Sequence, residues 1–510
     1  MKTYHSKKYI ILALIIQSCA PTIKIVDRHP NNQKKSSEVF RSKYLGEALQ
    51  KRLEYFSNGQ IKSETNFRQE QKHGKYVSYF TNGSISTEGE YKNNKKNGRW
   101  VWLGKSGKLD SIFHYKNGRL NGSYEIYNQG RISIKQNYKS GRLNGKITEF
   151  YANGNIKNKG SYLDDAPNNK WEWFSEKKQI TRLIHFKDGI KNGDFKVWSG
   201  DTLILSGSYL SDKRDGTWKW YRSKKQLDSL VTYSNGQLDG DYKKWNKEGA
   251  LKISGGFTND SRDGEWRWFS KSEDVDSTKT YALGVLDGAM HIYYKNGQLK
   301  KKQYFISGLL EGETASYYIS GQLQSKTQFK LNEKTGPFEL WTSAGQLEER
   351  GTYLKNEYHG PIQRNFSTGQ LASAATYSRG VLDGISQIFT PSGSMVKEIF
   401  YKMGTEIARI EYHDNGRFKK VIALDDKLKV YEREWNTDGF ENTRQIYITG
   451  TRTKADYYLT GQLKYECIYK GDNKHGMEWW FDEQRNPVKI NIYNNGVQLV
   501  SHDLLYDSDE

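Results

Sequence analysis

Proline and cysteine are scarce in this sequence of 510 residues, which holds 7 prolines and 2 cysteines. Two cysteines cannot build a disulfide framework. Hydrophobic residues make up 35% of the chain and aromatic ones 14%, so aromatic rings must supply much of the buried area. Glycine is plentiful, with 48 copies. Because glycine supports tight turns and aromatic side chains favour strands, this composition predicts many short strands rather than helices.

The usual signatures of catalytic and cofactor sites are also missing. The sequence contains no HExxH, CxxC, P-loop or G-x-S-x-G motif. Its ten histidines form no cluster along the chain. We therefore expect no enzymatic activity, no cofactor and no metal site.

The N-terminus has the pattern of a secretory signal over residues 1–18. Three lysines fall within the first eight residues, and the apolar segment 9–16 is too short to span a bilayer comfortably. The next residues, Ile16-Gln17-Ser18-Cys19, resemble a bacterial lipobox, in which Gln17 is a mild departure. This resemblance implies lipidation of Cys19 and anchoring on a membrane. The alternative is an ordinary cleaved signal peptide that ends near a chance cysteine.

The charge and the predicted export restrict the partners. A net charge of +20 favours anionic lipid, acidic polymers or acidic proteins, and nucleic acid is not expected outside the cytoplasm. Residues 20–26 carry no acidic side chain, which favours a periplasm-facing position on the outer membrane over the cell surface. If Cys19 is lipidated, Cys467 has no partner, and we expect it to be a packed thiol in a strand.

One sequence unit repeats along most of the chain. Its anchor is a glycine that most often follows Asn, Asp or His, with a spacing of 23 or 24 residues over most of the chain. The anchor glycines are Gly74, Gly98, Gly122, Gly145, Gly193, Gly216, Gly240, Gly264, Gly288, Gly312, Gly336, Gly360, Gly384 and Gly476, and Asn169 takes the place of one. An aromatic ring follows each anchor 16 or 17 residues later, at what we call the ring position (Tyr91, Tyr115 and Tyr233 are examples).

Each unit reads as two strands and two turns. In the unit from Gly288 to Gly312, an alternating segment, a Lys-Asn-Gly turn and a second strand that ends at Phe305 predict a β-hairpin. We therefore predict an all-β fold, an elongated single-layer antiparallel meander of about 19 tandem hairpins. Residues 50–500 form the array, 19–49 a flexible tether and 501–510 a frayed acidic tail. A short helix within Ser37–Leu53 is an alternative for that stretch.

Segments such as HIYYKNGQLK, SYYISGQLQ and DYYLTGQLK resemble the bacterial variant of the MORN repeat. The resemblance covers roughly nine tenths of the chain and implies a fold of tandem β-hairpins. Bacterial proteins of this kind are often described as YwqK-type antitoxins. For this chain the resemblance therefore also implies an antitoxin-like or immunity-like protein that neutralises a partner by binding it.

Tryptophan pairs are the best candidates for a binding face. They lie two and four residues after an anchor, as in the segment DGTWKWY. We call Trp100, Trp171, Trp218 and Trp266 the first-slot tryptophans, and Trp102, Trp173, Trp220 and Trp268 the second-slot tryptophans. Other units hold Tyr, Ile, Phe, Val or Met at these slots, which favours packing over recognition. If any face binds a partner, we expect it to be this aromatic one.

These observations favour a non-enzymatic, membrane-anchored scaffold of the cell envelope. It would bind protein, lipid or glycan partners through an extended β surface. The antitoxin or immunity protein is the alternative, although a secretory signal does not suit a cytoplasmic antitoxin.

Overall fold

The computed structural model describes residues 20–43, 46–223, 226–425 and 427–504. Signal residues 1–18 and Cys19 lie outside this range. The chain divides into two compact units, Met1–Gly240 and Asp241–Glu510. The described residues form strands and no helix, so none of them provides a helix able to cross a membrane.

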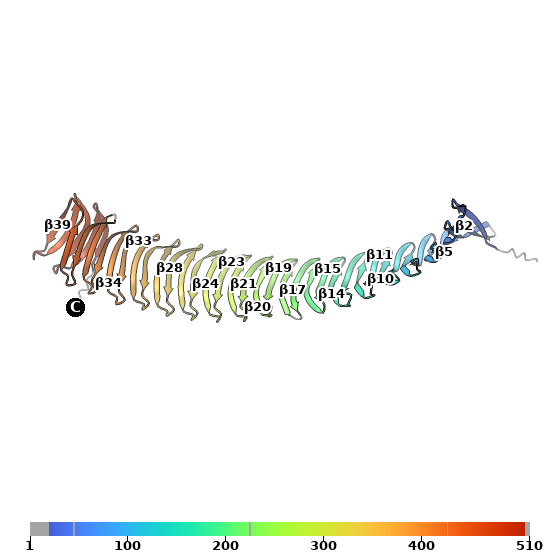
Figure 1. Cartoon of the computed structure of the whole chain (residues 1–510), viewed down its shortest axis with the longest axis horizontal. Helices are drawn as coiled ribbons and strands as arrows, with labels where there is room; N and C mark the ends of the chain where they lie inside the picture. Colours follow the sequence, from blue (N-terminus) through green and yellow to red (C-terminus); the bar gives the residue numbers. More distant parts are fainter. Residues whose placement is uncertain (1–19, 44–45, 224–225, 426, 505–510) are drawn as a thin grey trace, which may run out of the picture. The chain divides into compact units, whose positions relative to one another are not determined.

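In the first unit the strands follow one another in sequence order (Figure 1). They are β1 (Thr22–Arg28), β2 (Lys34–Lys43), β3 (Gly46–Tyr55), β4 (Ile61–Arg68), β5 (Gln71–Tyr79), β6 (Ile85–Lys92), β7 (Lys95–Leu103), β8 (Leu109–Lys116), β9 (Arg119–Asn128), β10 (Arg131–Lys139), β11 (Arg142–Phe150), β12 (Ile156–Leu163), β13 (Ala166–Phe174), β14 (Ile180–Lys187), β15 (Ile190–Ser199), β16 (Thr202–Leu210), β17 (Lys213–Ser223), β18 (Gln226–Ser234) and β19 (Gln237–Trp245), the last of which contains the boundary between the units.

The second unit continues with β20 (Leu251–Thr258), β21 (Ser261–Phe269), β22 (Val275–Ala282), β23 (Val285–Tyr293), β24 (Leu299–Ile306), β25 (Leu309–Leu310), β26 (Gly312–Tyr317), β27 (Leu323–Lys330), β28 (Glu333–Trp341), β29 (Leu347–Leu354), β30 (Glu357–Tyr358), β31 (Gly360–Asn365), β32 (Leu371–Ser378), β33 (Val381–Phe389), β34 (Met395–Lys402), β35 (Thr405–Tyr412), β36 (Phe418–Asp425), β37 (Leu428–Trp435), β38 (Glu441–Ile446), β39 (Thr451–Tyr457), β40 (Leu463–Lys470), β41 (Asn473–Phe481), β42 (Pro487–Asn494) and β43 (Val497–Asp503).

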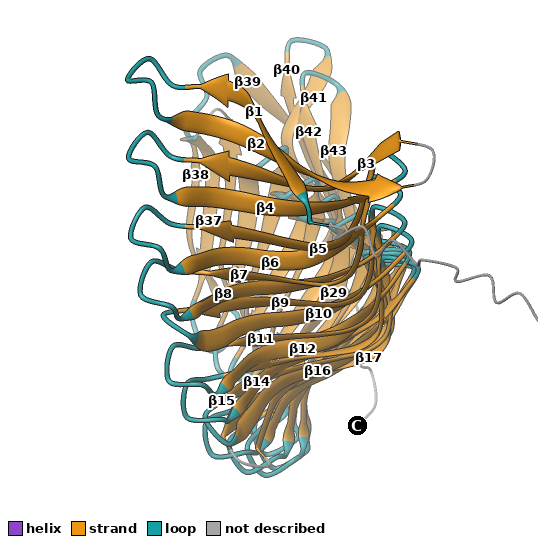
Figure 2. Ribbon diagram, turned by 90° about the vertical axis from the view of Figure 1, so that its right-hand side faces the viewer, coloured by secondary structure: helices purple, strands orange, loops and turns teal. Residues whose placement is uncertain are grey.

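The predicted antiparallel meander is confirmed. Strands β1 to β38 belong to one sheet of 38 strands, and neighbouring strands pair antiparallel through short turns (Figure 2). At two places the partner strand is divided in two: β25 and β26 both pair with β24, and β30 and β31 both pair with β29. The anchor glycine Gly216 has φ of 72° and lies opposite the ring-position residue Tyr233 on the next strand. A left-handed φ is easy for glycine and tolerated by Asn, which explains why Asn169, with φ of 60°, can replace an anchor.

The N-terminal region differs from the flexible tether expected over residues 19–49. Strands β1 and β2 pair antiparallel and β2 pairs with β3, so among the described residues the sheet includes strands from Thr22 onward. Ser37 is fully buried, and its hydroxyl lies 3.0 Å from the Tyr55 hydroxyl. The polar composition of this segment hides its alternating pattern, and its described residues form no helix.

The C-terminal end differs from a single layer. Strands β39 to β43 form a separate five-stranded sheet. Its side chains share one buried core with those of β34 to β37, in which Ile410, Val421 and Ile490 are 0% exposed. Two packed sheets make a sandwich, which buries the apolar face that a single sheet leaves open. The sandwich includes the region between Gly384 and Gly476, where the sequence has no anchor glycines. Strand β43 extends to Asp503, into the expected tail.

The sandwich also holds Cys467 and a polar link between its sheets. Cys467 is 0% exposed and free, as expected for a packed thiol, and burial raises the pKa of this thiol.

The two sheets are also linked by a buried carboxylate. Glu398 on β34, only 2% exposed, lies 3.2 Å from Nε2 of His502 on β43 and accepts a 2.8 Å hydrogen bond from the Tyr412 hydroxyl. Burial opposes the charge of Glu398, but bonds from His502, Gln387 and Tyr412 lower its pKa overall.

Candidate aromatic binding face

The tryptophan pairs project from one side of their strands because their members are two residues apart. Strand β17 carries Trp218 and Trp220, whose ring centroids lie 6.2 Å apart. The structure separates the two members by exposure: Trp218 is 0% exposed and Trp220 is partly exposed. The same division holds in strands β7, β13 and β21, where the first-slot tryptophan is buried and the second-slot one is partly exposed.

Each first-slot tryptophan packs on a glycine of the preceding strand. Ser206 pairs with Lys219 but Ser208 pairs with Asp215, so the Gly216–Trp218 segment bulges opposite Gly207. A Cβ atom on Gly207 would lie 2.3 Å from Cδ2 of Trp218. The Trp218 indole N–H donates to the Ser208 carbonyl at 3.1 Å, so its only polar atom is already paired. The indole is therefore a core element and not a free ligand surface.

The same glycine contact occurs at all four first-slot tryptophans. In every case the glycine is 11 residues earlier in the sequence, and its added Cβ would lie 2.2–2.3 Å from the indole. The pairs are Gly89 with Trp100, Gly160 with Trp171, Gly207 with Trp218 and Gly255 with Trp266. The spacing G-x10-W is visible in the sequence and could have identified these residues as packed.

Rings from neighbouring hairpins complete the packing around Trp218. Phe195, which fills the same slot one repeat earlier, has its centroid 5.5 Å away, and Tyr209 makes an edge contact at 5.1 Å. Such aromatic pairs contribute roughly 0.5–1.5 kcal/mol each beyond their area burial. The tryptophan therefore couples one repeat to the next.

Two residues before several anchors stands a lysine or arginine whose charged group lies over the neighbouring aromatic rings. The Arg214 guanidinium carbon lies 4.6 Å from the Trp218 ring and 5.3 Å from Tyr233. Lys96 lies 4.4 Å from Trp100 and 5.2 Å from Tyr115, and its burial there lowers its pKa. These lysines and arginines therefore belong to the packing of the repeat as well as to its charge.

The Asp and His side chains that precede several anchors accept hydrogen bonds from backbone N–H groups. Oδ1 of Asp263 accepts a hydrogen bond from the Leu283 N–H at 3.2 Å, and Oδ1 of Asp383 accepts one from Met403 at 3.1 Å. His475 accepts from the Asn495 N–H at 3.2 Å through Nδ1. Each contact ties a strand start to the turn that ends the next strand. Over the described ranges, no three His, Cys, Asp or Glu residues group as metal ligands.

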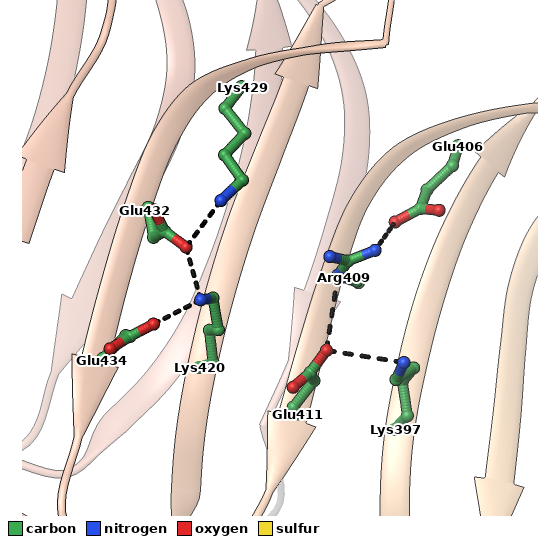
Figure 3. A network of polar contacts seen from close by, with 8 residues as sticks. All are labelled: Lys397, Glu406, Arg409, Glu411, Lys420, Lys429, Glu432 and Glu434. Carbon is green, nitrogen blue, oxygen red and sulfur yellow. Dashed lines mark hydrogen bonds and ion pairs between the residues drawn. The ribbon is translucent and has the colours of Figure 1, made fainter.

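A second surface of interest lies on the sandwich, where charged residues from β34 to β37 form a network (Figure 3). Lys420 lies 2.5 Å from Oε1 of Glu432 and also contacts Glu434, and Lys429 lies 3.0 Å from Glu432. Burial alone would raise the pKa of Glu432, but hydrogen bonds from Lys420, Tyr447 and Lys429 lower it to about 2. Paired charges of this kind cover the sheet and leave little unbalanced charge for a partner.

The fold and this packing define a tandem β-hairpin repeat protein. A family model described as MORN repeat variant matches residues 51–69, 72–93, 143–164, 286–307 and 382–403, so the chain is similar to this family in five segments. No curated protein matches the chain in sequence.

Solved structures that match include complexes of bacterial toxins. The crystal structure of TcdB2-TccC3 is 12% identical, with 92% of this chain and 27% of the other covered and a TM-score of 0.14. The Photorhabdus luminescens Tc holotoxin pore with a mutated TccC3 is 10% identical, with 91% and 31% covered and a TM-score of 0.13. The chain therefore spans less than a third of either protein, and scores this low give no information on its fold or function.

Proposed function

We propose that this protein is a non-enzymatic scaffold of the bacterial cell envelope that binds partners through its repeated β surface. The observation that carries the proposal is the division of each tryptophan pair. The first-slot ring builds the core, and the second-slot ring stays partly exposed beside it. Partly exposed aromatic rings on a rigid strand are well suited to binding because little conformational entropy is lost.

All four second-slot tryptophans have a lysine or arginine beside the ring, and this bears on the choice of partner. The Arg182 guanidinium carbon lies 4.3 Å from the Trp173 ring, and the Lys279 ammonium lies 5.4 Å from the Trp268 ring. Each exposed ring thus lies next to a positive charge. With the net charge of +20, this favours an acidic protein or an anionic lipid or polymer as partner.

A truncation series tests whether the binding surface is extended. Deleting whole hairpins should weaken capture of envelope components in steps as each hairpin with a second-slot tryptophan is lost, because each of these hairpins adds a similar contact surface. Loss of all capture on removal of one short segment, with the other hairpins dispensable, would contradict an extended surface.

The proposal includes a lipid anchor at Cys19 and an outer-membrane position that faces the periplasm. The lipobox-like segment supports it, and several acyl chains on one residue would bind a membrane stably. Growth with a labelled fatty acid should label the wild-type protein and leave Cys19→Ser unlabelled. Labelling of both proteins, or of neither, would contradict the anchor.

An antitoxin-like or immunity-like protein of the YwqK type is the second candidate. The five segments that match the MORN repeat variant are the observation that favours it. Co-purification with one small protein encoded nearby would support this candidate. Capture of several unrelated envelope components would support the scaffold.

A further inference from the structure

A cavity of about 800 Å³ opens at one end of the C-terminal sandwich. Four turns form its rim: 413–417 and 436–440 from the first sheet, and 458–462 and 482–486 from the second. Its volume falls in the range of about 300–1,000 Å³ that is usual for small-molecule sites. It lies entirely within the second unit.

Within each sheet, hydrogen bonds connect each rim turn to the neighbouring turn or strand end, so the rim is preformed. Nδ2 of Asn415 donates to the Thr437 carbonyl at 2.9 Å, and Nε2 of His413 lies 3.0 Å from the Trp435 carbonyl. In the second sheet, the Tyr458 hydroxyl donates to the Phe481 carbonyl at 2.7 Å. A preformed rim reduces the entropy that binding would cost.

The floor consists of aromatic rings around a buried guanidinium. Arg433 is only 6% exposed, and its guanidinium carbon lies 5.3 Å from the Trp435 ring and 5.7 Å from the Phe481 ring. Its Nε donates to Oε2 of Glu441 at 2.8 Å, and Nη1 lies 3.4 Å from Glu466. Because its charge is balanced by these carboxylates, Arg433 holds the rings in place and does not select an anion.

Several groups at the cavity are available to contact a ligand. Oε1 of Gln462 is buried and has no hydrogen-bond partner among the described residues, which is costly unless a donor reaches it. The Arg485 guanidinium, which also lines the cavity, makes no hydrogen bond or ion pair with the part of the chain that the structure describes. Phe440, at the rim, is 71% exposed. A ligand must therefore offer donors, acceptors and an apolar face together.

We propose that this cavity binds an uncharged oligosaccharide. A sugar ring has hydroxyls that both donate and accept, and an apolar C–H face that can pack on Phe440 and Trp435. An anion is disfavoured because three carboxylates, those of Asp438, Glu441 and Glu466, offset the charges of the three arginines at the cavity, Arg417, Arg433 and Arg485. A peptide bound by strand addition is disfavoured because the backbone of all four rim turns is bonded within each turn.

This inference goes beyond the proposed scaffold, because it concerns one cavity and not the repeated surface. The test uses the full chain and a panel of soluble oligosaccharides of α- and β-linked glucose, mannose and N-acetylglucosamine. Saturation-transfer NMR detects contact with sugar C–H protons, and calorimetry measures the affinity of those that bind. We expect saturable binding of at least one saccharide, with a Kd on the order of 0.1–1 mM.

Three variants locate the binding. Phe440→Ala and Arg485→Gln should each weaken it about tenfold, since they remove the exposed ring and the unpaired guanidinium. Leu459→Ala is the matched control, because Leu459 is a fully exposed apolar residue on a rim turn but does not line the cavity. Circular dichroism should show the same strand content and melting for all three.

The inference is wrong if no saccharide binds saturably, or if binding is unchanged in Phe440→Ala and Arg485→Gln. It is also wrong if a mixture of unstructured peptides binds in a Phe440-dependent manner while saccharides do not, since the cavity would then be a peptide site. Each of these results leaves the scaffold proposal untouched, because capture by the repeats is measured separately.

Discussion

The Trp218 indole lies directly over Gly207, so close that a Cβ atom at residue 207 would lie 2.3 Å from the ring. Gly207 on β16 lies opposite the bulge of β17, and Trp218 on that bulge is 0% exposed. The same contact recurs at each first-slot tryptophan. These four pairs are the packing units that distinguish their repeats from the others.

The first prediction concerns the glycine. Gly207→Ala should destabilise the hairpin by about 1–3 kcal/mol, because the added methyl overlaps a rigid indole in a packed site. Hydrogen exchange of β15 to β18 measures this locally, which suits an array that need not unfold in one step. Gly104→Ala is the control, since its Cβ would meet only the Lys108 carbonyl oxygen at 3.7 Å, an ordinary contact. Equal exchange in the two variants would contradict the packing described above.

The second prediction starts from a neighbouring repeat in which a different pair of residues fills the positions of Gly207 and Trp218. At the equivalent positions one repeat earlier stand Ile184 and Phe195, which lie opposite each other on β14 and β15. Gly207→Ile alone should be strongly destabilising. The double variant Gly207→Ile/Trp218→Phe should recover at least about 1 kcal/mol relative to the sum of the single effects. Strictly additive effects in urea denaturation would mean that the two residues do not pack as a pair.

The third prediction separates the two slots. Trp218→Ala should cost about 3–5 kcal/mol, because it removes a fully buried ring and leaves a cavity. Trp220→Ala should cost clearly less, since that ring is partly exposed. Thermal melting and hydrogen exchange of β16 to β18 compare them. Similar losses in both variants would place both rings in the core and remove the candidate binding face.

The sequence predicted the repeat and its strands well, because the signal lies within each unit. The anchor glycine and the ring position recur often enough to fix the pairing of Gly216 with Tyr233. The G-x10-W spacing is also in the sequence, but it joins the second strand of one unit to the first strand of the next, so no single unit shows it. The expectation that the tryptophans pack is confirmed for the first slots, while recognition at the second slots stays a prediction.

Features that depend on contacts between distant segments could not be predicted in the same way. The sandwich brings Phe400 and His502 to a ring distance of 5.6 Å although they are about a hundred residues apart, and no periodicity encodes that contact. The rim of the cavity likewise combines turns from both sheets. In β1 and β2, polar composition suggested a tether, but pairing with β3 stabilised strands there.

The fourth prediction concerns acid. The pKa of Glu432 is lowered from 4.5 to about 2, so its charge stabilises the fold fully above pH 4.5, and this contribution is lost as the pH falls toward 2. The lowered pKa of Glu398 acts in the same direction. Glu432→Gln should therefore remove part of the acid sensitivity, about 1 kcal/mol after solvent screening. Urea midpoints between pH 6 and about pH 2 measure it.

The control for this prediction is Glu248→Gln, which alters an exposed turn carboxylate far along the sequence from the network of Figure 3. It should leave the pH profile unchanged. A Glu432→Gln variant whose stability falls with acid as steeply as that of the wild type would show that the network does not hold the carboxylate charged.

The fifth and most direct test asks whether the second-slot tryptophans bind partners. Alanine at Trp102, Trp173, Trp220 and Trp268 should abolish most capture of envelope components by the full chain while strand content is retained. The matched control replaces four other exposed apolar residues, Ile85, Ile156, Leu210 and Leu283, and should capture as the wild type does. Unchanged capture by the folded tryptophan variant would contradict the proposed binding face, and with it the central claim that these repeats form an aromatic binding scaffold.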